Sequence, residues 1–182
     1  MSGAEPDSCV TDVDRYLAGA ARMMASVRYC WLATHSDGGD FGIRPMGLLP
    51  KENGDPDWTM RFLTDGRSRK AGEIRRDPRV AVMFLHDAND ASVKVSGLAR
   101  LLEDPSYVQP RWKSAYNRVF PTEEDRASAA FVQIEFERME LWIRGVTPEP
   151  WGVSATVLER NRAGNWRLVP ARADRASERQ VL

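Results

Sequence analysis

Apolar residues near the start of the chain recur at helical spacing. Steps of three and four residues separate them between Thr11 and Val27, as Val13, Tyr16, Leu17, Ala20, Met24 and Val27. One face of an α-helix repeats at this period. The pattern therefore predicts an amphipathic helix over residues 11–27.

Strand and turn patterns follow this helix. Residues 28–35 (RYCWLATH) are rich in β-forming side chains, SDGGD supplies turn residues, and FGIRPMGLLP resumes an extended apolar pattern, which together predict a hairpin. KENGDPD marks the next turn, and WTMRFLT then alternates apolar and polar positions over a strand's length. We therefore expect a second hairpin that shares a strand with the first.

The middle of the chain predicts one short helix between strands. In SRKAGEIRR (68–76), Ser68 is a candidate cap for the first turn, and Asp77-Pro78 is a stop signal. RVAVMFLH follows as a strand, and SVKVSGLARLLE predicts a longer one. Glycine inside a strand usually marks a bend or a close backbone approach, so Ser96-Gly97 predicts a bulge.

The remaining segments predict one more helix and four strands. Asp104-Pro105 opens a helix that runs to Val119, with a kink at Pro110. FVQIEFE and MELWIR predict two strands, and ATVLER and NWRLV predict a last pair around the loop NRAG. Many short strands with few helices favour a barrel or sandwich. We expect a single domain over residues 1–170 and a frayed tail over 171–182.

Composition narrows the classes of partner. The chain has 182 residues, a usual size for one domain, and its 26 basic and 26 acidic residues cancel, so any anion site must be local. Cys9 and Cys30 are the only cysteines, which predicts neither a thiolate metal site nor a disulfide framework. The acidic start and the lack of a long apolar run favour a soluble cytoplasmic protein without nucleic-acid or membrane partners.

The densest chemistry lies around one junction of strand and helix. Thr64, Ser68, Arg69 and Lys70 fall where a strand ends and a helix begins. Hydroxyls, free backbone N–H groups and two cations can converge there on one anion, and a phosphate fits this description. A solvated helix N-terminus is the alternative interpretation of SRK taken alone.

Four segments between Val27 and Trp142 resemble a known family. They are IRPMG, LTDGRSRKAGEIRRDPRVAVMF, VKVSGLARLLEDP and MELWIRG. With them the sequence resembles the FMN-binding split-barrel family that includes pyridoxamine 5'-phosphate oxidase, and more closely its general-stress-protein branch. The resemblance implies a mainly β fold, a six- to eight-stranded, Greek-key-like split β-barrel with flanking helices. It also implies a homodimer with FMN at the interface.

The same resemblance implies roles for individual residues. Arg44 would approach the phosphate and the isoalloxazine, and the backbone of Pro45 and Met46 would line the ring. Leu63 and Thr64 would lie near the ring and the ribityl chain. The phosphate would be held by Ser68, Arg69 and Lys70. Trp142, and also Trp151, would close the pocket from the partner chain.

Two departures from the oxidase bear on activity. Leu49 stands where that enzyme has a substrate-binding lysine, and NWRLVPARADR replaces its C-terminal arginine–histidine motif. We therefore do not expect oxidation of pyridoxamine phosphate. Three hypotheses remain: an FMN-dependent oxidoreductase with an unknown small-molecule redox partner; a flavin-binding stress or redox-sensing module without turnover; or a relative that uses FAD, a deazaflavin or haem.

Other reactive residues carry no recognisable arrangement. His35 and His86 lack further metal ligands at a suitable spacing, so no metal site is predicted. Cys30 is expected to fill core space. The carboxylates near the phosphate region, Asp65, Glu73 and Asp77, are interpreted as charged surface.

Overall fold

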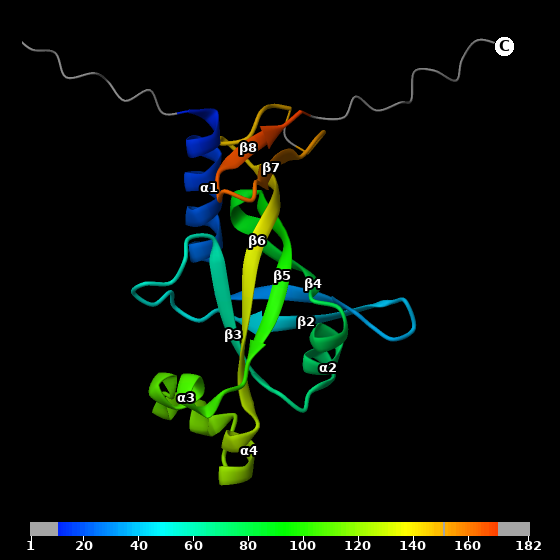
Figure 1. The fold of residues 1–182 in the computed structure, drawn as a ribbon. Helices are drawn as coiled ribbons and strands as arrows, with labels where there is room; N and C mark the ends of the chain where they lie inside the picture. The colour runs from blue at the N-terminus through cyan, green and yellow to red at the C-terminus, as the bar shows by residue number, and fades with distance from the viewer. Residues whose placement is uncertain (1–10, 151, 171–182) are drawn as a thin grey trace, which may run out of the picture.

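The computed structural model describes residues 11–150 and 152–170. The fraying expected of residues 171–182 and the role given to Trp151 therefore lie outside the described residues. Figure 1 shows the elements along the chain. The helices are α1 (Asp12–Ser26), α2 (Arg69–Arg76), α3 (Pro105–Val108) and α4 (Glu123–Ala127), and short 3-10 turns span Asp87–Asn89, Gln109–Arg111 and Ser114–Arg118. The strands are β1 (Tyr29–His35), β2 (Phe41–Gly47), β3 (Thr59–Asp65), β4 (Arg79–His86), β5 (Ala91–Leu102), β6 (Ala129–Ile143), β7 (Thr156–Arg160) and β8 (Trp166–Val169).

The strands form one antiparallel sheet of eight strands, which confirms the mainly β prediction. Its order is β2-β1-β4-β5-β6-β7-β8, and β3 pairs with β6 beside this path. The long strands β5 and β6 run through the centre of the molecule, with β1, β2 and β4 crossing behind them (Figure 1). The opening helix is also confirmed, because α1 begins after its cap Thr11 and ends before Val27. None of the helices within the described residues is long and apolar enough to cross a membrane.

The prediction of a second hairpin, in which β2 would pair with β3, is wrong. β2 pairs with β1, whereas β3 pairs along its whole length with β6, from Thr59↔Glu135 to Asp65↔Ala129. The reason lies in the connection between β2 and β3. Its carboxylates fold back onto β3 itself, where the buried Arg61 donates to Glu52 (3.1 Å) and Asp55 (2.7 Å). A buried guanidinium requires such partners, so the connection follows Arg61 and leaves β2 and β3 unpaired with each other.

A bulge between β5 and β6 confirms the interpretation of Ser96-Gly97. The register shifts there, so that Ser96 pairs with Arg138 while Gly97 pairs with Phe136. A Cβ at Gly97 would overlap the carbonyl of Glu135, so only glycine allows the two backbones to approach this closely. The two strands predicted over FVQIEFE and MELWIR are instead one 15-residue strand, β6. No glycine or proline interrupts it, and the bulge accommodates the bend without a turn.

The helix predicted from Asp104 to Val119 is shorter than expected. Asp104 caps it by accepting from the backbone N–H of Ser106 (2.8 Å), but α3 ends at Val108 and 3-10 turns continue. Pro110 cannot donate to a helical hydrogen bond, which accounts for the break. The helix α4 was not predicted from the sequence, although Thr122 and Asp125 form a capping box there.

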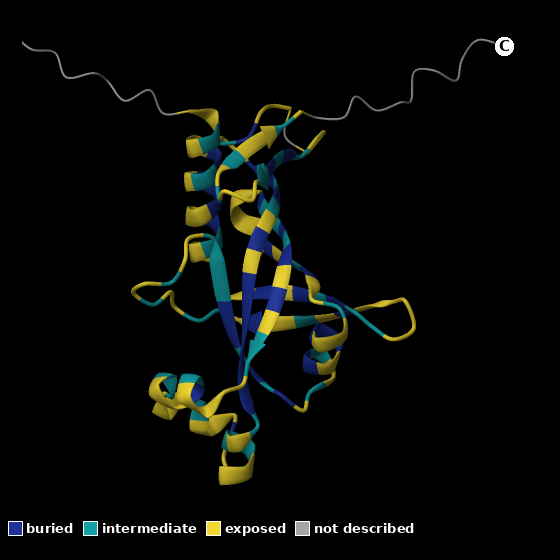
Figure 2. Ribbon diagram, viewed as in Figure 1, coloured by how far each residue is buried: buried dark blue, intermediate teal, exposed yellow. Residues whose placement is uncertain are grey.

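Two groups of buried side chains hold these elements. The main core lies between α1 and the sheet, and includes Phe62, Phe84 and Leu141 (Figure 2). A second core cluster (Val108, Phe120, Ala129 and Phe131) sits under α3 and the 3-10 turns. Partly buried Leu49 and Leu63 pack against it, so it reaches both β3 and the residue that follows β2 by two positions.

Replacing Gly97 by Ala tests the close approach of β5 and β6. Because the added methyl group meets backbone and not a flexible side chain, we expect the free energy of unfolding to fall by about 1–3 kcal/mol or more. Urea denaturation measures it. Gly72→Ala is the control, since a Cβ there meets nothing within 4 Å. Equal stability of the two variants would contradict the constraint.

Candidate functional site

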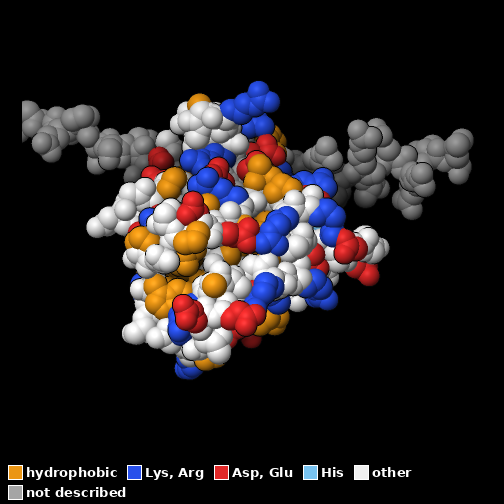
Figure 3. Space-filling view, turned by 60° about the horizontal axis from the view of Figure 1, so that its bottom comes forward, with side chains coloured by type: hydrophobic (Ala, Val, Ile, Leu, Met, Phe, Trp, Pro, Cys, Tyr) orange, Lys and Arg blue, Asp and Glu red, His pale blue; other side chains and the backbone are white. Residues whose placement is uncertain are grey.

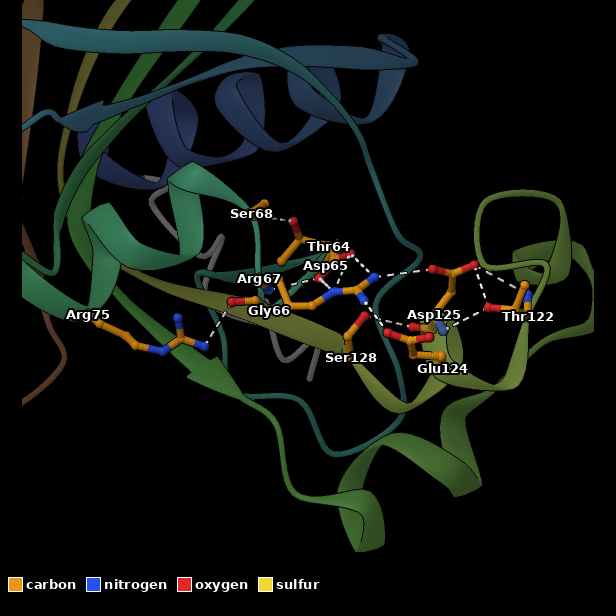
Figure 4. Close-up of polar contacts among 10 residues, drawn as sticks. All are labelled: Thr64, Asp65, Gly66, Arg67, Ser68, Arg75, Thr122, Glu124, Asp125 and Ser128. Carbon is orange, nitrogen blue, oxygen red and sulfur yellow. Dashed lines mark hydrogen bonds and ion pairs between the residues drawn. The ribbon is translucent and has the colours of Figure 1, made fainter.

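The turn between β3 and α2 is held by its own backbone and by Ser128, the residue between α4 and β6. Gly66 N–H donates to the carbonyl of Ser128 (2.7 Å), Arg67 N–H to Asp65 Oδ1 (2.7 Å) and Ser68 N–H to the carbonyl of Asp65 (3.0 Å). Arg75, from the last turn of α2, donates to the carbonyl of Gly66 (3.0 Å; Figure 4). These bonds fix the position at which α2 begins.

Arg67 is fully engaged in holding this turn. Its guanidinium contacts Asp65 (2.8 Å), Asp125 (3.1 Å) and Glu124 (3.5 Å), which ties α4 to the turn (Figure 4). The hydrogen bond from Arg67 is the main cause that lowers the pKa of Asp65 to about 2. The first arginine of GRSRK therefore serves the scaffold and faces carboxylates.

The first turn of α2 leaves donors open. Ala71 and Gly72 N–H groups both donate to the carbonyl of Ser68 (3.0 and 3.2 Å). Within the described residues, the N–H groups of Arg69 and Lys70 meet no acceptor. The Ser68 side chain makes no capping bond and instead lies 3.4 Å from Thr64 Oγ1. Two backbone donors and two hydroxyls thus lie at the N-terminal end of α2.

Lys70 brings an uncompensated charge to the same place. Its side chain is half-buried, and it forms no ion pair or hydrogen bond within the part of the chain that the structure describes. Burial lowers the pKa of Lys70, and the positive charge of Arg44 lowers it further, against weaker opposing effects of Asp65 and Glu73. A desolvated cation without a counter-ion is unfavourable in the free protein. It is therefore suited to receive an anion.

Arg44 lies beside Lys70 and is bound to a buried carboxylate. Its Nη2 is 2.9 Å from Glu73 Oε2, and its Nη1 donates to Thr34 Oγ1 (2.5 Å). Thr34 in turn donates to Glu73 Oε2 (2.5 Å). The side chain of Glu73 is only 3% exposed, so its interpretation as charged surface is wrong. Arg69 Nε lies 3.3 Å from its other oxygen.

A glycine makes room for this ion pair. A Cβ at Gly42 would overlap the guanidinium of Arg44 and lie 3.1 Å from Glu73 Oε2. Three residues of this ion-pair network were not predicted from the sequence to belong to the site: Thr34, Gly42 and Glu73. Gly42 carried a usable signal, because glycine inside a strand often marks a close approach. No sequence feature indicated that Glu73 is buried, since a carboxylate on a short charged helix usually faces solvent.

The residues expected to line a flat ring lie on two unpaired strand edges. β2 pairs only with β1 and β3 only with β6 among the described strands. Pro45 is exposed on β2, Met46 is buried in the main core, and Leu63 is half-buried on β3. Leu49 packs against the second core cluster.

Trp142 is not near these residues within one chain. At one end of β6, Ala129 pairs with Asp65 beside the α2 junction, whereas Trp142 pairs with Ser92 at the other end. The thirteen residue steps from Ala129 to Trp142 correspond to roughly 40 Å of extended strand. The sequence-predicted residues therefore form one group around Thr64–Lys70 with Arg44, and Trp142 lies apart from it.

Positive and negative side chains are mixed on the face of the molecule that carries α3 and α4. Viewed from the end where α3 and α4 lie, acidic and basic side chains are intermixed over the surface, with hydrophobic groups between them (Figure 3). No area of a single sign dominates this face. The open donors and Lys70, and not the overall charge of the chain, are therefore what would attract an anion.

Acidification tests the buried Glu73. Burial opposes its charged form, but hydrogen bonds from Thr34 and Arg44 and the charge of Arg44 outweigh it, so its pKa lies below 4.5. The stabilisation that the ionised Glu73 gives the fold is then complete above about pH 4.5, and it is lost as the pH falls through the lower pKa of Glu73 in the folded protein.

We expect Glu73→Gln to reduce the free energy of unfolding by about 1.5–3 kcal/mol at neutral pH, and by less in acid. Urea titrations from neutral to acidic pH measure this. The exposed Glu135→Gln is the control, and a difference from wild type that does not change with pH would contradict the assignment.

Solved structures share this fold at low sequence identity. A protein from Clostridium acetobutylicum, described as related to general stress protein 26 and as of the pyridoxinephosphate oxidase family, is 14% identical over 80% of this chain and 94% of that chain, with a TM-score of 0.65. A pyridoxamine 5'-phosphate oxidase-related, FMN-binding protein from Nostoc punctiforme is 16% identical over 85% and 94%, with a TM-score of 0.64. An F420 reductase is 19% identical over 65% and 93%, with a TM-score of 0.50.

These likenesses identify the fold as the split barrel of this group of proteins. Among curated proteins, none matches this sequence. The family model described as pyridoxamine 5'-phosphate oxidase like matches residues 18–148, which is more than half of the chain. This chain therefore belongs to the pyridoxamine 5'-phosphate oxidase-like family.

Proposed function

We propose that the protein binds FMN, with the flavin phosphate at the first turn of α2. The observation that carries this proposal is the half-buried Lys70 without a counter-ion, beside the open N–H groups of Arg69 and Lys70. A phosphate dianion would compensate Lys70, accept from both amides and accept from Thr64 and Ser68. Charge-assisted hydrogen bonds of this kind are about twice as strong as neutral ones.

The flat ring of the flavin would lie along the unpaired edges of β2 and β3. Backbone groups at Pro45 and Met46 would face one side of it, and Leu63 would supply an apolar contact. A bound flavin supplies hydride and electron transfer. The residues of this chain bind and orient it, since the ion pair with Glu73 holds the Arg44 side chain in place beside Lys70. We therefore propose a flavin-dependent oxidoreductase that uses a small-molecule redox partner.

We further propose that two copies pair through the outer face of β1, β2 and β4. Cross-strand neighbours such as Trp31 with Met83 and Ala33 with Ile43 place apolar side chains together on this face. Several of the large ones are half exposed or more: Tyr29 (55%), Trp31 (50%), Phe41 (62%), Ile43 (61%) and Leu85 (58%). Monomeric proteins rarely expose so large a contiguous apolar patch.

The same face extends to Trp142. Leu85 pairs with Ser92 on β5, and Ser92 pairs with Trp142 on β6, so the three side chains form one row across the sheet. A dimer built on this face would bring Trp142 of one copy towards its partner. This supports the expectation that Trp142 closes the flavin pocket of the other subunit, since it lies far from the pocket of its own chain.

Two alternatives use the same site. A flavin-binding stress or redox-sensing module would bind FMN without turnover. A deazaflavin or FAD would place a phosphate in the same position, and the likeness to an F420 reductase keeps the deazaflavin in consideration. Titration with FMN, riboflavin, FAD and F420 separates these ligands, and oxidation of reduced nicotinamide by the loaded protein separates enzyme from sensor. Binding of FMN no tighter than riboflavin would overturn the phosphate site.

Lys70→Gln tests the cation at the centre of the proposal. We expect FMN binding to weaken by roughly 1.5–3 kcal/mol, about ten- to a hundredfold, because one charge-assisted bond is lost. Riboflavin binding and the stability of the free protein should not fall, since the variant removes an uncompensated buried charge. Fluorescence titration and thermal unfolding measure these effects. The exposed Lys113→Gln is the control, and equal FMN affinity in all three proteins would remove Lys70 from the site.

Ile43→Asp tests the proposed interface. A charge in the middle of the apolar face should disrupt pairing, so the wild-type protein should be a dimer by light scattering and the variant a monomer. Val119→Asp is the control, because Val119 is 67% exposed but lies outside this face. A monomeric wild-type protein would overturn the proposed dimer, and a dimeric Ile43→Asp variant would place its interface elsewhere.

A further inference from the structure

A second concave site lies between α1, the start of β3 and the connection that joins β2 to β3. It is a cavity of about 680 Å³, within the usual range for a small-molecule site. Its walls include Met24 of α1, Leu48 and Leu49 after β2, Met60 of β3 and Phe136 of β6. None of the residues proposed to hold the flavin phosphate lines it, so the cavity is distinct from the anion site.

The lining of this cavity carries no uncompensated charge. Its two charged residues, Lys51 and Asp57, form an ion pair with each other at 2.8 Å. The hydroxyl of Thr59 is also occupied, because it donates to the carbonyl of Pro56 (2.8 Å). A charged ligand would lose its hydration here without gaining a partner. The lining therefore favours a neutral, apolar molecule.

One aromatic wall is held in a strained backbone conformation. Trp58 has φ of 60°, in the left-handed region that bulky residues avoid. Its carbonyl accepts from Phe136 N–H (3.0 Å), and its ring packs edge-on against Trp166 with centroids 5.6 Å apart. Such strain persists only where the surroundings enforce it, and it clusters at binding sites. The Trp58 ring is thus a preformed wall for a flat apolar ligand.

The cavity and the anion site lie at opposite ends of the same two strand edges. β3 runs from Thr59 and Met60 at the cavity to Thr64 at the anion site, and β2 runs from Arg44 towards Leu48 and Leu49. Four to five residues of strand correspond to roughly 13–17 Å. If the proposed function holds, a flavin with its phosphate beside Lys70 points its ring towards the cavity.

We propose that this cavity binds a neutral, apolar aromatic molecule, and that molecules of this class are the second substrate beside the flavin. The chemical class of the ligand follows from the residues that line the cavity, whereas the ligand's role as second substrate rests on the proposed function. The apolar side chain of Leu49 agrees with this class, because it lines the cavity.

Two dyes that differ by one charge test the ligand class on the full chain. N-phenyl-1-naphthylamine is neutral, and 1-anilinonaphthalene-8-sulfonate has the same rings with an added sulfonate. We expect the neutral dye to bind saturably at one molecule per chain, and the sulfonate to bind at least tenfold more weakly. Equal affinity for the two dyes, or no saturable binding of the neutral one, would overturn the proposal.

Alanines on α1 provide a matched pair of variants. Ala25 is exposed and lines the cavity, whereas Ala18 is exposed on the same helix and does not. Ala25→Phe should fill the cavity and weaken binding of the neutral dye at least tenfold, while Ala18→Phe should leave it within twofold. Equal effects of the two variants would overturn the proposal. So would a change of oligomeric state in Ala25→Phe alone, because the cavity would then be covered by a second copy.

FMN titration of the same proteins separates the two proposals. FMN binding that is equal in all of them, with dye binding lost only in Ala25→Phe, supports both. FMN binding without dye binding overturns this inference alone. Dye binding with the expected pattern but without FMN binding overturns the proposed function, and with it the role as second substrate, and leaves the ligand class standing.

Discussion

At the junction of β3 and α2, the half-buried positive charge of Lys70 has no paired carboxylate within the described residues. Glu73 neutralises Arg44, and Asp65 with its neighbours neutralises Arg67, but no carboxylate of the described residues pairs with Lys70. The fold therefore maintains a half-buried positive charge that weakens the free protein. Ionisable groups with a shifted pKa cluster at functional sites. The rest of the site, from the open amides of α2 to the adjacent Arg44, is arranged around this excess charge.

Contacts from the surrounding elements hold this junction in position. The backbone bonds at Gly66 and Ser68, together with the contacts of Arg67 to α4, fix the first turn of α2 against β6. Gly97 lets β5 and β6 approach closely, and β6 carries both β3 and the outer row that ends in Trp142. One long strand thus connects the anion site of a chain with the face that we propose for its partner. A dimer through this face would couple the two sites of the assembly.

The two ends of the β2 and β3 edges differ in chemistry. The α2 end offers cations and unbonded donors, whereas the other end offers aromatic and thioether side chains with paired charges. Such a division suits an amphipathic cofactor with a charged tail and a flat ring, and it leaves apolar space beyond that ring.

The sequence alone determined the features that depend on local patterns. Helical and strand periodicity gave α1, the β1–β2 and β7–β8 hairpins and the bulge at Gly97. The anion site that we propose also comes from the sequence, since Thr64–Lys70 are neighbours along the chain. Only the tertiary structure decided which strands pair over long distances. In the tertiary structure β3 pairs with β6 and not with β2, and the two predicted strands form the single strand β6. Glu73 is buried beside Arg44 and Thr34. These outcomes depend on packing between residues distant in sequence, and a local pattern carries no information about such contacts.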